Sequence, residues 1–159
     1  MTNDENQINV LCQRLGQAHH DKDVDAIVGC YAPDAVIYSL APPLRDAIDR
    51  DGIAAWLETW DGPIRIDAQD VELVVGGDIA CTTALNRMRG TKTNGTKEDI
   101  WFRTTMCFQK IDGAWRIAHD HSSVPFYMDG SLKAAVDLKP EPLMASGANA
   151  DNRVGAESP

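Results

Sequence analysis

The hydrophobic positions near the start of the chain repeat with the period of an α-helix. The repeating residues are Ile8, Leu11, Leu15 and Ala18. Their spacings of three and four predict an amphipathic helix over about residues 3–22. A short second helix is predicted over 24–31 after the N-cap candidate Asp23, and a third over 52–60 after the N-cap candidate Asp51.

The remaining hydrophobic pattern is typical of β-strands. The expected strands cover residues 35–40, 64–75, 79–92, 98–109 and 114–124, and the last four are separated by Gly76-Gly77-Asp78, Asn94-Gly95 and Asp112-Gly113. These separators are typical of hairpin turns, and Asp-Gly favours a two-residue type I′ turn. Helices followed by a run of hairpins predict an α+β fold with one curved antiparallel sheet wrapped round the helices.

The chain of 159 residues has the length of one domain. We expect this domain to cover residues 1–139, with a short terminal helix over 131–138. Residues 140–159 are rich in Pro, Gly, Ala, Ser and Asn, and we expect them to form a disordered tail because they contain little to bury.

Composition argues against several partners. The net charge of −9 would repel nucleic-acid phosphates and anionic lipid headgroups. No apolar run approaches the roughly 18 residues of a membrane span, and the polar, acidic N-terminus does not resemble a secretory signal. The four cysteines form no C-x-x-C pair and fit a reducing compartment. We therefore expect a cytoplasmic protein that binds neither nucleic acid nor membranes.

The last hairpin carries the most distinctive polar residues. If the Asp112-Gly113 turn sets an uninterrupted register, the facing pairs include Phe108 with Ile117, Met106 with His119, and Thr104 with His121. This register places His119 and His121 on a largely apolar face, as in a small-ligand pocket with few polar groups. They are our candidate catalytic residues, and a β-bulge would exchange the two faces.

The same two histidines could reach one metal ion from neighbouring positions on a strand. The sequence supplies no third ligand in a recognisable pattern such as H-E-x-x-H. We therefore expect neither a metal site nor a cofactor.

Six further residues are candidates for lining a ligand pocket. They are Tyr38, Trp56, Trp60, Asn86, Arg103 and Met106. The aromatic side chains either fill the core or line the pocket. Asn86 either faces solvent or donates a hydrogen bond in the pocket, and Arg103 either contacts an anion there or forms a cross-strand ion pair with Asp120.

Residues 101–126, which read WFRTTMCFQKIDGAWRIAHDHSSVPF, resemble the closing hairpin of SnoaL-like proteins. Matching segments at 31–35, 42–44, 76–78 and 85–87 occur in the same order, so the resemblance covers about residues 4–140. It implies membership of the nuclear transport factor 2-like superfamily. The implied fold is a cone in which three N-terminal helices pack on a curved antiparallel sheet around a pocket, and the implied assembly is a homodimer through the sheet.

Ketosteroid isomerases belong to the same superfamily, but this sequence departs from them. The resemblance places Leu15 where they have the oxyanion-hole tyrosine and Ser39 where they have the general-base aspartate. Neither side chain can do that chemistry, so we do not expect a true steroid isomerase. The closing His-x-His-x-Ser pattern also resembles the association domain of calcium/calmodulin-dependent kinase II, which serves assembly.

Two hypotheses about function therefore remain open. In the first, the protein is a cofactor-free lyase, isomerase or cyclase that acts on a small, partly apolar carbonyl compound, with His119 or His121 as acid or base. In the second, it is a non-catalytic module for ligand binding or dimerisation. The sequence contains no G-x-S-x-G or phosphate-binding loop that would indicate other chemistry.

Overall fold

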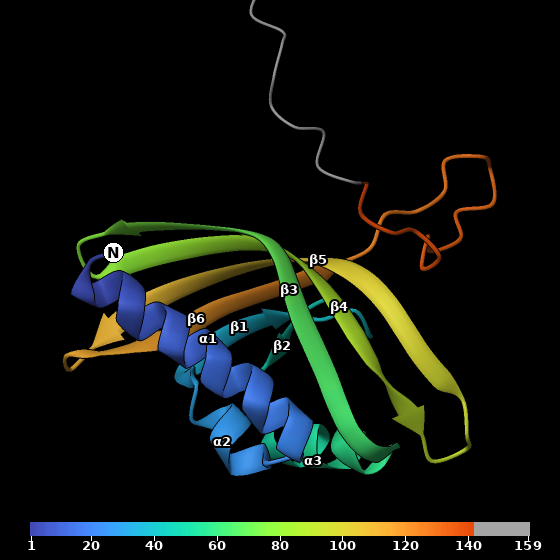
Figure 1. Ribbon diagram of the computed structural model, residues 1–159, viewed down its shortest axis with the longest axis horizontal. Coiled ribbons are helices and arrows are strands. Elements are labelled where there is room, and N and C mark those ends of the chain that lie inside the picture. Colours follow the sequence, from blue (N-terminus) through green and yellow to red (C-terminus); the bar gives the residue numbers. More distant parts are fainter. Residues whose placement is uncertain (142–159) are drawn as a thin grey trace, which may run out of the picture.

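A computed structural model describes residues 1–141 as three helices and one sheet (Figure 1). The helices are α1 (Asn3–Asp21), α2 (Val24–Val28) and α3 (Arg50–Glu58). The strands are β1 (Tyr31–Tyr38), β2 (Asp46–Ala47), β3 (Trp60–Gly76), β4 (Ile79–Lys92), β5 (Lys97–Ile111) and β6 (Ala114–Ser123). The predicted α+β class and the three N-terminal helices are confirmed. Most of the expected tail lies outside the described residues.

The helix starts follow from side-chain caps. At the start of α1, the Glu5 amide donates to Thr2 Oγ1 (3.2 Å) and the Thr2 amide donates to Glu5 Oε2 (2.6 Å), which satisfies two otherwise unpaired amides. Asp23 caps α2, as predicted. Helix α3 begins two residues earlier than expected, because Asp49 rather than Asp51 accepts the capping hydrogen bond.

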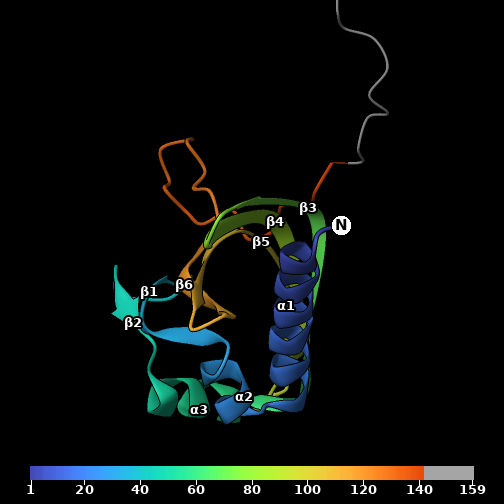
Figure 2. The same ribbon diagram turned by 90° about the vertical axis from the view of Figure 1, so that its left-hand side faces the viewer.

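The six strands form one curved sheet in the order β2-β1-β6-β5-β4-β3. Figure 2 shows the sheet arching over α1, with α2 and α3 closing the opposite side. All pairings are antiparallel except that of β1 with β6, which is parallel. Tyr31 begins β1 instead of ending the second helix, and Pro33 falls where the β1–β6 register shifts, a position that tolerates its missing amide.

The core lies between the helices and the concave face of the sheet. Its largest members are Ile8, Leu11, Leu15, Ile27, Leu57, Trp60, Ile64, Phe108, Trp115 and Ile117. Phe108 and Ile117 are fully buried and face each other across β5 and β6. The apolar stripe predicted for the first helix is therefore the surface that packs on the sheet.

A β-bulge in β6 changes the register predicted for the last hairpin. The turn itself is as expected, because Asp112 (φ 50°) and Gly113 (φ 79°) both have the positive φ of a type I′ turn. Pairing then runs regularly to Phe108 and Ile117, but Ala118 has no partner and the next pair is Cys107 with His119. The predicted pairs beyond the bulge are wrong by one residue, and the faces of the strand are exchanged.

The expected helix over residues 131–138 is not formed. Leu132 (φ 53°), within this segment, and Gly130 (φ 89°), just before it, adopt left-handed conformations that interrupt a helix. The segment instead folds back, and the Ala135 amide donates to the Pro125 carbonyl (2.8 Å). Ala135 is buried, whereas the larger apolar side chains nearby, such as Phe126, are exposed.

Replacing Phe108 with alanine should test the position of the core. Phe108 is 0% exposed, so Phe108→Ala removes a buried ring and leaves a cavity. We expect the free energy of unfolding to fall by about 3–5 kcal/mol in urea denaturation. The control Val74→Ala, at a side chain that is 70% exposed, should change it by less than about 0.5 kcal/mol.

Candidate functional site

A cavity of about 450 Å³ lies between the helices and the sheet. Its walls come from α1, α2, α3, the strands β1 to β4 and β6, and the segment that follows β1. The lining residues include His19, Tyr31, Trp56, Ile66, Met88, Asp120 and Ser122. Most of this surface is apolar, as is usual for small-molecule sites. Asp46 and Asp49 lie at its exposed part, whereas Asp120 is partly buried.

Asp120 is the central polar residue of this cavity. The bulge at Ala118 turns Asp120 toward the helices, where the Tyr31 hydroxyl donates to Asp120 Oδ2 at 2.8 Å. The second carboxyl oxygen, Oδ1, is buried and has no hydrogen-bond partner in the protein. A buried carboxyl oxygen without a partner is uncommon in folded proteins, and Asp120 is among the residues that line the cavity.

Burial is the largest cause of the shifted pKa values of Asp120 and Tyr31. Desolvation raises the pKa of Asp120, while the Tyr31 hydrogen bond and the charges of His119 and His121 lower it, and the net change is upward. The pKa of Tyr31 is raised well above its ordinary value, first by burial and then by the neighbouring Asp120 charge. Tyr31 therefore stays a hydrogen-bond donor, and Asp120 holds its proton to a higher pH than an exposed carboxyl does.

His19 supplies a second titratable group. Its Nδ1 lies 2.8 Å from the Leu15 carbonyl oxygen, so Nδ1 carries the proton that it donates and Nε2 is left as the acceptor in the neutral ring. Burial lowers the pKa of His19, partly offset by this hydrogen bond. The ring makes an edge contact with Trp56, at a centroid distance of 6.0 Å. The site therefore combines an imidazole whose pKa is lowered with a carboxyl whose pKa is raised.

The structure brings only part of the predicted pocket together. Tyr38 and Trp56 line the cavity. Trp60 is buried in the core, and the cavity lining includes neither Met106 nor Asn86. Asn86 lies on the inner face of the sheet and donates to Thr104 Oγ1 at 2.8 Å.

His119, His121 and Arg103 lie on the outer face of the sheet. His119 Nδ1 donates to the Val36 carbonyl at 2.7 Å, and both histidine rings make edge contacts with Tyr38. Arg103 donates to Ser123 Oγ at 3.2 Å, so the predicted ion pair with Asp120 is wrong. The cause is the bulge, which turned Asp120 inward and both histidines outward.

Sequence reasoning missed His19 and Tyr31 and assigned Asp120 to the wrong face. His19 follows Leu15 by four residues, so it lies on the apolar stripe of α1, and that position was a usable signal. Tyr31 was assigned to a helix. The orientation of Asp120 depends on the β-bulge at Ala118, and no residue pattern in β6 predicts that bulge.

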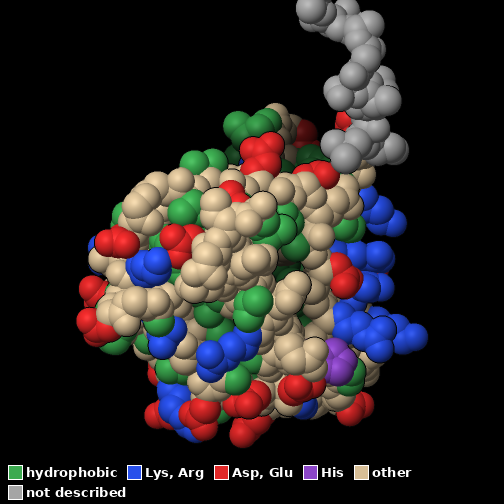
Figure 3. Space-filling model, turned by 60° about the vertical axis from the view of Figure 1, so that its left-hand side comes forward, with side chains coloured by type: hydrophobic (Ala, Val, Ile, Leu, Met, Phe, Trp, Pro, Cys, Tyr) green, Lys and Arg blue, Asp and Glu red, His purple; other side chains and the backbone are tan. Residues whose placement is uncertain are grey.

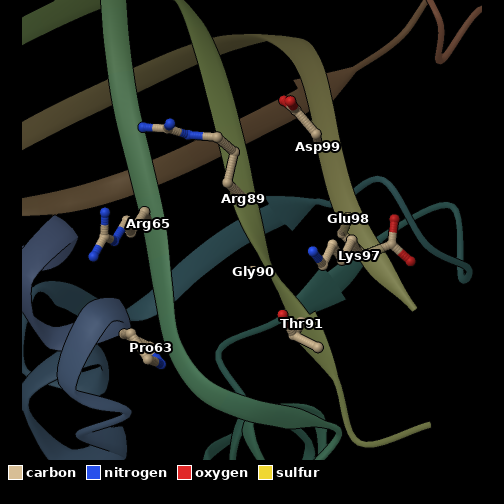
Figure 4. A pocket seen from close by; sticks show the side chains of 8 residues that line it. All are labelled: Pro63, Arg65, Arg89, Gly90, Thr91, Lys97, Glu98 and Asp99. Atoms are coloured by element: carbon tan, nitrogen blue, oxygen red, sulfur yellow. The ribbon is translucent and has the colours of Figure 1, made fainter. Parts of the chain in front are cut away.

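A second cavity, of about 560 Å³, lies where β3 begins, β4 ends and β5 begins. Figure 4 shows charged side chains around it, with Arg89 reaching toward β3. Figure 3 shows Lys and Arg side chains gathered along one edge of the molecule, despite its net charge of −9. Arg89 forms an ion pair with Asp67, and Arg87 pairs with Asp99 at 2.7 Å. Because Arg65, Lys97 and Asp99 in this second lining are exposed to solvent, we take the apolar cavity as the candidate site.

Two wider features bear on the choice of site. Within residues 1–141, no group of three or more His, Cys, Asp or Glu side chains is arranged to hold a metal ion. No helix in that part of the chain has the length and apolar character needed to cross a membrane.

Comparison with known proteins places the chain in a family. A family model described as a SnoaL-like domain matches residues 8–127. The chain belongs to the SnoaL-like family. No curated protein matches the sequence.

Solved structures agree with this assignment of the fold. An NTF2-like protein of unknown function from Pseudomonas putida KT2440 is 28% identical, covers 88% of this chain and 99% of its own, and gives a TM-score of 0.74. A candidate dehydratase of the NTF2-like family from Streptomyces avermitilis is 15% identical (76% and 95% covered, TM-score 0.65). A candidate calcium/calmodulin-dependent protein kinase II association domain from Xanthomonas campestris is 24% identical (73% and 84%, TM-score 0.62). This SnoaL-like protein therefore has the nuclear transport factor 2-like fold that its sequence predicts.

Replacing Asp120 with asparagine should reveal the cost of the buried charge. The folded-state pKa of Asp120 lies above its unfolded value, so the wild type loses stability as the pH rises through the folded-state pKa. Asp120→Asn keeps an acceptor for Tyr31 and removes the ionisation. We expect its melting temperature, relative to wild type, to increase as the pH is raised from about 4, the unfolded-state value, until the folded-state pKa of Asp120 has been passed. The same substitution at the exposed Asp34 is the control, and an equal pH trend there would contradict this reasoning.

Proposed function

We propose that this SnoaL-like protein is a cofactor-free enzyme that transfers a proton on a small, partly apolar carbonyl compound, as a lyase, isomerase or cyclase does. The observation that carries the proposal is Asp120, which lines an apolar cavity and has a buried oxygen, Oδ1, without a partner in the protein. Leaving such an atom unpaired costs on the order of 1–3 kcal/mol, which a bound ligand would relieve. The cavity volume suits a compound of small-metabolite size.

The proposed roles follow from the two shifted pKa values. Burial raises the pKa of Asp120 and lowers that of His19, so the carboxyl keeps its proton to a higher pH, and the imidazole loses its proton at a lower pH, than the free groups do. The two shifts bring the pKa values of a candidate acid and a candidate base toward each other. In this proposal His19 Nε2 removes a proton from carbon next to the carbonyl, and Asp120 protonates the developing oxyanion or a departing hydroxyl. Tyr31 is a positioning residue that holds the carboxyl through its 2.8 Å hydrogen bond.

Support from relatives is limited to the class of chemistry. The NTF2-like protein from Streptomyces avermitilis is named as a candidate dehydratase, and dehydration is an elimination that needs one acid and one base. His119 and His121, our first candidates for acid and base, contact Tyr38, which also lines the cavity. They remain a second pair to test.

Turnover experiments on matched variants test this proposal. A thermal-shift screen with small ketones, hydroxy-carbonyl compounds, aromatic polyketides and steroids identifies a ligand, since binding raises the melting temperature. For a ligand that is turned over, we expect Asp120→Asn and His19→Gln each to lower kcat/KM by about 10²–10⁴-fold. We expect Tyr31→Phe to act mainly on kcat and its pH profile.

The outer-face histidines supply the matched controls. His119→Ala and His121→Ala should leave kcat/KM within about threefold of wild type. If instead these two variants lose activity while Asp120→Asn and His19→Gln keep it, the catalytic site is at the histidine pair and our assignment is overturned. Ligands that bind tightly but are never altered would favour the non-catalytic binding module.

We further propose that two copies associate through the outer face of β4, β5 and β6, and that the protein is cytoplasmic. The four cysteines are unpaired, as is usual where glutathione keeps thiols reduced. The aromatic cluster of Tyr38, His119 and His121 supplies apolar contact area on the outer face.

Light scattering after size-exclusion chromatography tests the assembly. Thr105 lies opposite both Thr83 and His121 in the middle of the proposed interface. We expect Thr105→Arg to convert a dimer into a monomer, because it places a large charge at the centre of the contact. Val10→Arg, at an exposed position on α1, should remain dimeric. A wild-type monomer at all concentrations would refute the proposed assembly.

A further inference from the structure

Cys81 and Cys107 face each other on adjacent strands. They are directly paired in the ladder between β4 and β5. At one end of this ladder the Lys92 amide donates to the Thr96 carbonyl (2.8 Å), and at the other the Lys110 amide donates to the Asp78 carbonyl (2.9 Å). Both bonds identify the even-numbered positions of β4 as the hydrogen-bonded pairs. The pair of Cys81 and Cys107 is therefore a non-hydrogen-bonded pair, in which side chains approach most closely.

The distances of such a pair suit a disulfide. Cα atoms in a non-hydrogen-bonded antiparallel pair are about 4.5 Å apart, within the range of about 4.4–6.8 Å found for disulfides. The two thiols are close enough that a hydrogen bond from Cys81 is among the causes that raise the pKa of Cys107, after burial and the Cys81 charge. Both residues are partly exposed in a single copy, so a small oxidant can reach them while the outer face of the sheet is not covered by a second copy.

We propose that Cys81 and Cys107 form a redox-modification site, at which a peroxide converts the two thiols into a disulfide between β4 and β5. In the first step, the thiolate of one cysteine attacks a peroxide oxygen, the O–O bond breaks, and a sulfenic acid and water or an alcohol result. In the second, the other thiol attacks the sulfenic sulfur, forms the S–S bond and releases water. Two thiols are oxidised by two electrons, and one peroxide is reduced by two.

The other two cysteines do not offer an equivalent site. Cys30 is 0% exposed, and its thiol donates to the Ala26 carbonyl at 3.3 Å. Burial raises the pKa of Cys12 to about 11, so its thiolate is scarce at neutral pH. Oxidation should therefore select the pair on the sheet. It should be slow, because the Cys107 thiolate is also disfavoured.

Peptide mapping of the full-length protein identifies the bond. The reduced protein is treated with hydrogen peroxide, the remaining thiols are blocked with iodoacetamide, and the chain is digested with trypsin. Cys81 then lies in the peptide 66–87 and Cys107 in the peptide 104–110. We expect a cross-linked species of these two peptides, lighter by two hydrogen atoms than their sum, while Cys12 and Cys30 carry the blocking group.

Variants separate this proposal from non-specific oxidation. Cys107→Ser should abolish the cross-linked species and leave a sulfenic acid on Cys81 that dimedone traps, and Cys12→Ser should leave the cross-link unchanged. The oxidised wild type should melt at a higher temperature than the reduced form, since the bond restricts the unfolded chain. A disulfide between two copies, a bond between Cys12 and Cys30, or full alkylation of Cys81 and Cys107 after peroxide would each overturn the proposal.

Discussion

The carboxyl group of Asp120 imposes the strictest physical requirement on this structure, because a carboxyl group in an apolar cavity needs a partner or must keep its proton. Tyr31 provides one hydrogen bond at 2.8 Å, and the second oxygen remains without a protein partner. Burial then raises the pKa of Asp120. A group held in this state is a cost to folding, and such costs are retained in proteins chiefly where they serve function.

The side chains that surround the Asp120 carboxyl come from distant parts of the chain. Tyr31 comes from β1, Asp120 from β6 and His19 from α1, so the site exists only when the helices have packed on the sheet. The fully buried pair of Phe108 and Ile117 joins β5 to β6, and Ile117 precedes Asp120 by three residues in β6. The stability of the apolar core and the geometry of the polar site are therefore coupled.

The sequence was informative wherever a local rule decided the outcome. The periodic stripe of α1, the cap Asp23 and the type I′ turn at Asp112 and Gly113 were all predictable, because each depends on neighbouring residues. The residues of the candidate site were less predictable from the sequence. Tyr31 lies three residues after α2, where helix and strand patterns overlap, and the unpaired Ala118 has a side chain that suits either face. Long-range packing decided both positions, and no local pattern reports it.

The bulge at Ala118 also has a consequence for how this chain can change over evolutionary time. Exposed loops can in general gain or lose a residue with little effect, but β6 cannot, since its length before Asp120 determines which way every later side chain points. Deleting one residue there would exchange the two faces of the strand. Asp120 would then point outward, and His119 and His121 would point into the cavity. Homologous chains that differ by one residue in this strand should therefore present different chemistry to the same cavity.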